Sequence, residues 1–173
     1  MRPRDARIRP LGSGDAADLY RVRLAPRVME GTLGLPTLTP DRWRREVEAM
    51  LQNPDNHCLV ADIDGEVVGA VNLDVGRGRK SHSATLGIMV RDDFAGRGLG
   101  SRLLDEMISA ADDWLAISRI ELEVFADHGA VVGLYESRGF AREGLKRRAA
   151  FRGGEYRDVL VMARLLPDKS PSG

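Results

Sequence analysis

Three glycines between a short apolar strand and an amphipathic helix are the feature that most constrains how this chain can fold. Residues 85–90 have the length and β-branched content of a buried strand. Gly96, Gly98 and Gly100 follow a polar turn and open a helix whose apolar stripe is Leu99, Leu103, Leu104, Met107 and Ile108. Backbone N–H groups at a helix start are unpaired, and the helix dipole favours negative charge there. We therefore expect an anion site with a phosphate ester as its ligand.

Two common phosphate loops fit these glycines only in part. A P-loop needs Gly-Lys-Ser/Thr, whereas Gly98 is followed by Leu99. A dinucleotide fingerprint needs a third glycine where Ser101 stands, although Glu121 lies at the expected distance downstream. A glycine-rich turn before an ordinary helix is the alternative without a ligand, and it stays open at this point.

Composition limits the classes of partner. The 173 residues suit one domain, and Lys plus Arg equals Asp plus Glu at 26 each, so no overall field favours nucleic acid or a membrane surface. The first ten residues lack the apolar region of a signal peptide, and no apolar run has membrane-spanning length. We expect a cytoplasmic protein with no nucleic-acid or membrane partner. The single cysteine, Cys58, is interpreted as a buried thiol rather than a nucleophile.

The order of the elements predicts the fold class. We expect an α+β fold: one domain over residues 1–173 with a core over about 7–165, a disordered tail over 167–173 and a mixed, mainly antiparallel sheet flanked by helices. Only the central strand–helix–strand is parallel. Helices are expected over residues 16–24, 40–52 and 129–138, and the helix that the glycines open is expected to end near residue 114. Residues 29–36 are too rich in glycine and proline for regular structure. The expected strands are 7–11, 57–62, 66–74, 85–90, 119–125, 140–148 and 156–165.

Two motifs in the right order carry a family resemblance. Gly98-Leu99-Gly100 matches the second half of the loop R/Q-x-x-G-x-G/A, and Leu134-Tyr135-Glu136 with Gly139-Phe140 matches L-Y-E-x-x-G-F. With the element order over residues 7–165, the chain resembles the GNAT superfamily of acyl-coenzyme A N-acyltransferases. The segments IDGEVVG, RIELEVF and GEYRDVLVMARL are most similar to a branch that acetylates free L-amino acids.

The resemblance implies acetyl-CoA as acyl donor and assigns residues to it. The backbone of Ile88, Met89 and Val90 would pair with the pantetheine arm, and an exposed N–H there would polarise the thioester carbonyl. His128 would contact the same arm, and Tyr135 would act as the general acid for the departing thiolate. The pyrophosphate would be held by the loop residues Gly96, Arg97, Gly98, Leu99, Gly100, Ser101 and Arg102.

Three positions depart from the family pattern. Ala95 stands where the loop has Arg or Gln, Thr85 where many relatives have a glutamate base, and His128 where asparagine is usual. The general base is therefore assigned to the next strand, to Glu123, with Glu121 as the alternative on the same strand face and His82 as a third candidate with a suitable intrinsic pKa.

The predicted function is transfer of an acetyl group to a primary amine, either a free L-amino acid or a similar small amine. Two alternatives remain: acetylation of a protein or peptide N-terminus, and a non-catalytic acyl-CoA-binding regulatory module. The three histidines are scattered without metal-ligand spacing, so no metal is expected. A homodimer stays open.

Overall fold

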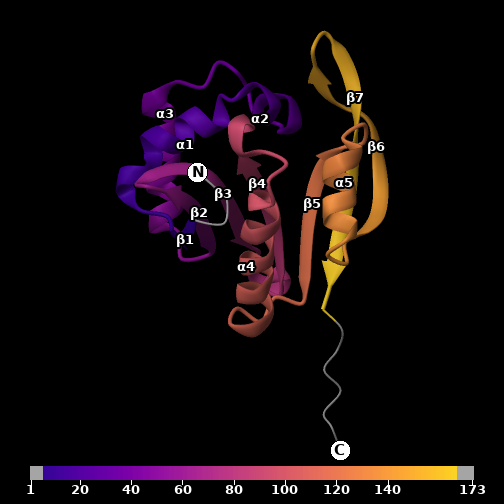
Figure 1. Ribbon diagram of the computed structural model, residues 1–173. Coiled ribbons are helices and arrows are strands. Elements are labelled where there is room, and N and C mark those ends of the chain that lie inside the picture. Colours follow the sequence, from indigo (N-terminus) through magenta and orange to yellow (C-terminus); the bar gives the residue numbers. More distant parts are fainter. Residues whose placement is uncertain (1–5, 167–173) are drawn as a thin grey trace, which may run out of the picture.

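The computed structural model describes residues 6–166 and contains one seven-stranded sheet in the order β1-β2-β3-β4-β5-β7-β6 (Figure 1). The predicted tail over 167–173 lies outside the described residues. Neighbouring strands are antiparallel except β4 and β5, which are parallel, so the predicted fold class is confirmed. The strands are β1 Arg7–Pro10, β2 Asn56–Ile63, β3 Glu66–Val75, β4 Ser83–Val90, β5 Arg119–Phe125, β6 Ala141–Arg152 and β7 Glu155–Leu165.

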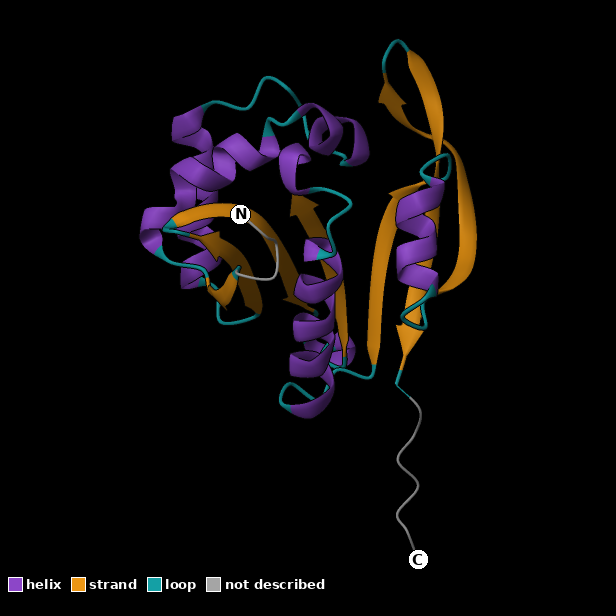
Figure 2. Ribbon diagram, in the orientation of Figure 1, coloured by secondary structure: helices purple, strands orange, loops and turns teal. Residues whose placement is uncertain are grey.

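Helices cover both faces of the sheet and divide its core in two (Figure 2). On one face α4 (Leu99–Asp113) and α5 (Gly129–Glu136) pack on the strands, and the predicted stripe of α4 is buried except for the half-buried Ile108. On the other face α1 (Ala16–Arg23) and α3 (Pro40–Gln52) cover β2 and β3 with Leu19, Trp43 and Val47. Residues 67–71 of β3 are all buried because this strand serves both layers: Val68 and Val71 belong to the core under α4, and Val67 and Ala70 to the core under α1 and α3.

One predicted irregular segment is partly helical. Pro26 begins a short helix, α2 (Pro26–Gly31), so residues 29–31 are its last turn rather than part of a loop. Proline ends the preceding helix and also suits the first position of the next one, because its missing N–H would have had no partner there. The sequence-based prediction took Pro26 only as the end of the helix over residues 16–24.

The β6–β7 hairpin forms the far edge of the sheet and projects beyond the other strands in Figure 1. Its outer strand, β6, is exposed along nearly its whole length. The predicted hairpin between β2 and β3 turns at Asp64 and Gly65, which both have positive φ, at 52° and 86°. This is the two-residue turn that the twist of paired strands favours.

Candidate active site

The parallel strands β4 and β5 part shortly after they begin. Their pairing consists of Ser83 with Arg119, Ala84 with Ile120 and Thr85 with Glu121. On its other side β4 stays paired with β3 as far as Val90. Along the β5-facing edge of residues 86–90, the part of the chain that the structure describes therefore supplies no strand partner. This edge contains the predicted residues Ile88, Met89 and Val90, and its free backbone groups suit an extended amide-containing chain.

The glycine loop leads from the end of β4 into α4. Gly96 and Gly98 have positive φ, at 71° and 84°, and a Cβ on either would meet no atom within 4 Å. Within residues 6–166, no hydrogen bond is donated by the backbone N–H groups of residues 96–101, and the helical series begins when Arg102 N–H donates to Gly98 O at 3.1 Å. Open space, free donors and the dipole of a long helix together fit a pyrophosphate.

The predicted loop side chains lie in different directions. Leu99 is fully buried, so only its backbone faces the loop, whereas Arg97 is exposed. Arg102 Nη2 donates to Ala6 O at 3.0 Å. A Cβ on Gly100 would lie 3.7 Å from Val90 Cγ2, so this glycine is where α4 passes close to β4. The P-loop and dinucleotide alternatives both belong to predominantly parallel sheets, and this sheet is mainly antiparallel.

Tyr135 lies on α5 on the same sheet face as α4. Its side chain is 5% exposed, and its ring centroid is 5.6 Å from that of Phe140. The hydroxyl has no hydrogen-bond partner among the described residues, yet it is not one of the fully enclosed polar atoms, so it reaches solvent. Burial raises the pKa of Tyr135 to about 12. The phenol is protonated at neutral pH, as a tyrosine with the ordinary pKa of about 10 also is, and burial moves its ionisation further above neutral pH.

The predicted carboxylates of Glu121 and Glu123 point to the sheet face opposite to that of Tyr135. Ile120, Leu122 and Val124 enter the core under α4 and α5, so the residues between them point to the opposite face of β5. Glu123 is about two-fifths exposed and pairs with Lys146 of β6. Glu121 accepts from Arg119 at 3.0 Å, and Arg119 also binds Glu143. A phenol and carboxylates thus flank the diverging strands from opposite faces.

The two histidine candidates lie at opposite ends of the strands. His82 precedes β4, and its backbone oxygen accepts from Ser118 N–H at 3.0 Å, far along the strand from the glycine loop. His128 directly precedes α5, and its imidazole lies against α2: a Cβ on Gly31 would be 2.9 Å from His128 Cε1. Its contact with a pantetheine arm remains a prediction.

The family resemblance also suggests acceptor ligands, Glu30 for an ammonium group and Arg148 or Arg152 for a carboxylate, and the structure brings Glu30 and Arg152 together in a cluster at the end of β5. Arg152 of β6 donates from Nη2 to Asp127 Oδ2 at 2.5 Å and from Nη1 to Glu30 O at 3.1 Å. Its guanidinium carbon lies 4.3 Å from the centroid of the Phe125 ring. These residues are up to 122 positions apart in sequence, so no local pattern indicates the contact.

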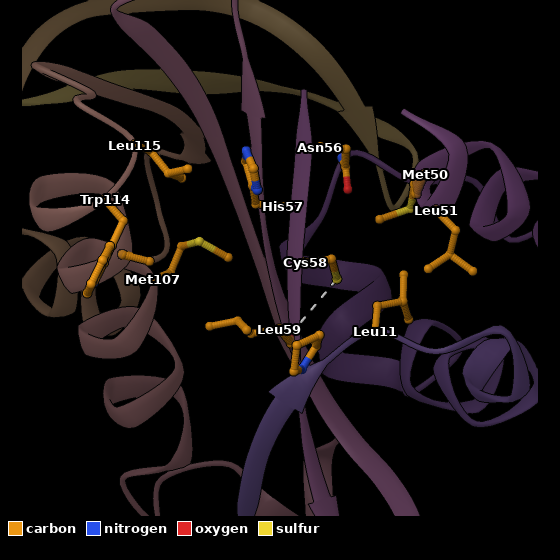
Figure 3. Close-up of a pocket in the computed structure, with 12 residues that line it drawn as sticks. Leu11, Met50, Leu51, Asn56, His57, Cys58, Leu59, Met107, Trp114 and Leu115 are labelled. Atoms are coloured by element: carbon orange, nitrogen blue, oxygen red, sulfur yellow. Dashed lines mark hydrogen bonds between the residues drawn. The ribbon is translucent and has the colours of Figure 1, made fainter. Parts of the chain in front are cut away.

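A cavity of about 350 Å³ lies elsewhere, between the ends of α3 and α4 (Figure 3). Apolar side chains such as Met50, Met107 and Trp114 line it, and none of the predicted site residues does. Cys58 is at its wall, with Sγ 4.0 Å from Leu59 O. Burial, followed by the negative charges of Asp15 and Asp74, raises the pKa of Cys58 to about 12, so the thiol is protonated at neutral pH, and it is half-buried at the cavity wall rather than fully enclosed as predicted.

Residues 6–166 hold neither a cluster of metal ligands nor a helix that could span a membrane. Over residues 6–166, no three His, Cys, Asp or Glu side chains gather where they could hold a metal ion. None of the helices within this range combines the length and the apolar character needed to cross a membrane.

Comparison with known proteins places this geometry in context. Residues 27–140 match the family described as acetyltransferase (GNAT) family. The chain is 38% identical to the L-amino acid N-acetyltransferase AaaT of Escherichia coli (strain K12), over 91% of this chain and 96% of that protein. It is 36% identical to the N-alpha-acetyltransferase RimI of Mycobacterium tuberculosis (strain ATCC 25618 / H37Rv), over 63% and 65%. The fold matches spermidine N-acetyltransferase from Vibrio cholerae, solved with CoA and spermine, with a TM-score of 0.84, 22% identity, and coverage of 94% and 96%.

Proposed function

The chain belongs to the acetyltransferase (GNAT) family, and from this premise we propose that it transfers the acetyl group of acetyl-CoA to the amino group of a free L-amino acid. The observation that carries the proposal is the parting of β4 from β5 after Thr85 and Glu121, beside the free N–H groups at the start of α4. Similarity to an L-amino acid N-acetyltransferase over 91% of the chain supports the acceptor.

The donor would be held mainly by backbone. The N–H groups of residues 96–101 would bind the pyrophosphate, because the space beside Gly96 and Gly98 is open. The unpaired edge of residues 88–90 would bind the pantetheine amides and place one N–H on the thioester oxygen. Acetyl-CoA supplies the activated acetyl group, and Arg97 would add positive charge at the loop.

Two side chains would move protons on opposite faces of the sheet. Glu123 would take a proton from the acceptor amine, whose nitrogen forms the new C–N bond as the C–S bond breaks. Tyr135, which is protonated at neutral pH, would donate its hydroxyl proton to the departing sulfur. His128 would complete the site beside the pantetheine arm.

The test is an acceptor panel with the purified chain. Release of the CoA thiol is measured with acetyl-CoA and each of the free L-amino acids, spermidine, and dipeptides that begin with the same residues. We expect release with one or a few L-amino acids. Release only with dipeptides would support the peptide N-terminal alternative, whereas CoA binding without any release would support a non-catalytic module. Sedimentation of the same sample tests whether the chain forms the homodimer that the sequence leaves open.

A further inference from the structure

Helix α2 is attached at its beginning to the β4 side of the diverging strands. The backbone N–H of Arg27 donates to Asp92 Oδ2 at 3.1 Å. Asp92 opens the 3₁₀ turn Asp92–Phe94, which follows β4 directly and leads into the glycine loop. The start of α2 is therefore fixed to the segment that leaves β4.

The end of α2 is attached to the β5 side. Arg152 donates to Glu30 O and to Asp127, and it lies over the ring of Phe125, so one guanidinium joins α2, the segment after β5, and β6. The Arg152 side chain is 24% exposed, which limits competition from water for these contacts. Asp127 also lies 3.8 Å from Arg157 of β7.

A steric contact adds to the polar one. The Cβ of any residue other than glycine at position 31 would lie 2.9 Å from His128 Cε1, closer than real Cβ atoms approach a neighbour. Gly31 thus lets the last turn of α2 rest on the imidazole of the segment between β5 and α5.

From these contacts we propose that α2 is a strap across the ends of β4 and β5 that restricts the acceptor to a free amino acid or an amine of similar size. Figure 1 shows α2 between the end of β4 and the β6–β7 hairpin, where the two parallel strands are far apart. A peptide acceptor must extend away from its amine, and a helix fixed on both sides obstructs that path. Arg152 is the specificity-determining residue, because it holds the strap on the β5 side. The inference rests on the proposed function.

The experiment compares Arg152→Gln with Arg142→Gln. Arg142 is likewise a β6 arginine in an ion pair, with Glu136 at 2.8 Å, although it is more exposed than Arg152, and within residues 6–166 none of its hydrogen bonds or ion pairs involves α2. The measured quantity is the ratio of kcat/KM for a dipeptide to kcat/KM for the free amino acid with the same first residue. We expect R152Q to raise this ratio at least tenfold and R142Q to leave it within twofold of the wild-type value.

A second variant keeps the test decisive if the Arg152→Gln protein folds poorly. Gly31→Ala should push α2 away from His128 and raise the same ratio, and hydrogen exchange in residues 26–36 should quicken in both variants. An unchanged ratio in soluble R152Q and G31A, with wild-type activity intact, would overturn the strap. A wild-type protein that acetylates neither acceptor would contradict the proposed function instead.

Discussion

The two sides of the diverging strands are built from different groups. On the α4 side, the candidate pyrophosphate site consists of backbone N–H groups around Gly96 and Gly98, with open space beside them. On the α2 side, the contacts are between charged side chains and distant segments, as with Arg152 and Glu30. A backbone site depends on local conformation and tolerates changes in charge, whereas a side-chain site depends on the pairing of particular residues.

The largest effect is expected from removing the hydroxyl of Tyr135, because this residue is the proposed general acid for the departing thiolate. Tyr135→Phe should lower kcat at least about 100-fold, the usual contribution of a positioned acid, and leave the KM for acetyl-CoA within about threefold. Steady-state kinetics on the preferred amino acid check this. Tyr156→Phe is the control, because Tyr156 is 58% exposed near the hairpin tip. Equal kcat in Y135F and the wild type would remove the proposed acid.

The next largest effect on kcat is expected from Glu123, the proposed base on the opposite face of β5. Glu123→Gln should lower kcat about 30-fold, less than the loss of the acid, because water can accept the amine proton in part. Glu121→Gln should have a smaller effect, because Glu121 lies where β4 and β5 are still paired, whereas Glu123 lies past the point at which they part. The two variants are compared at one pH with saturating substrates. The reverse order of effects would transfer the role of base to Glu121.

Alanine substitutions at two glycines, Gly98 and Gly65, separate the effect on acetyl-CoA binding from the effect of backbone strain. Gly98 and Gly65 have nearly the same φ, at 84° and 86°, and open space at the Cβ position, but only Gly98 lies at the proposed pyrophosphate site. Alanine at either position should destabilise the fold by about 1 kcal/mol. Only G98A should raise the KM for acetyl-CoA, by about tenfold, or about 1.4 kcal/mol. Equal KM values in the two variants would count against a pyrophosphate at this loop.

The same contrast explains how far the sequence predicts the molecule. The hairpin at Asp64-Gly65, the buried stripe of α4 and the open glycine loop follow from local rules of turn, periodicity and helix start, and the structure shows all three. The strap does not follow from them, because Arg152 finds Glu30 only after the sheet has formed. Helix α2 was missed for a local reason, since Pro26 both ends one helix and begins the next. The roles of Tyr135 and Glu123 remain predictions.

Alkaline pH should reveal the smallest effect, the energetic cost of burying the phenol on the α4 side. The pKa of Tyr135 is about 12 in the folded chain and about 10 when unfolded, so between these values the unfolded chain binds fewer protons and stability falls as pH rises. At pH 11 the loss from this group is about 1 kcal/mol relative to pH 8. Tyr135→Phe lacks the ionisable group and should escape this loss, whereas Cys58 ionises in both proteins and cancels in the comparison. Urea unfolding at pH 8 and pH 11 measures the difference in the free energy of unfolding. If Y135F and the wild type lose stability equally, burial does not raise the pKa of Tyr135, and the phenol ionises as readily in the folded chain as in the unfolded one.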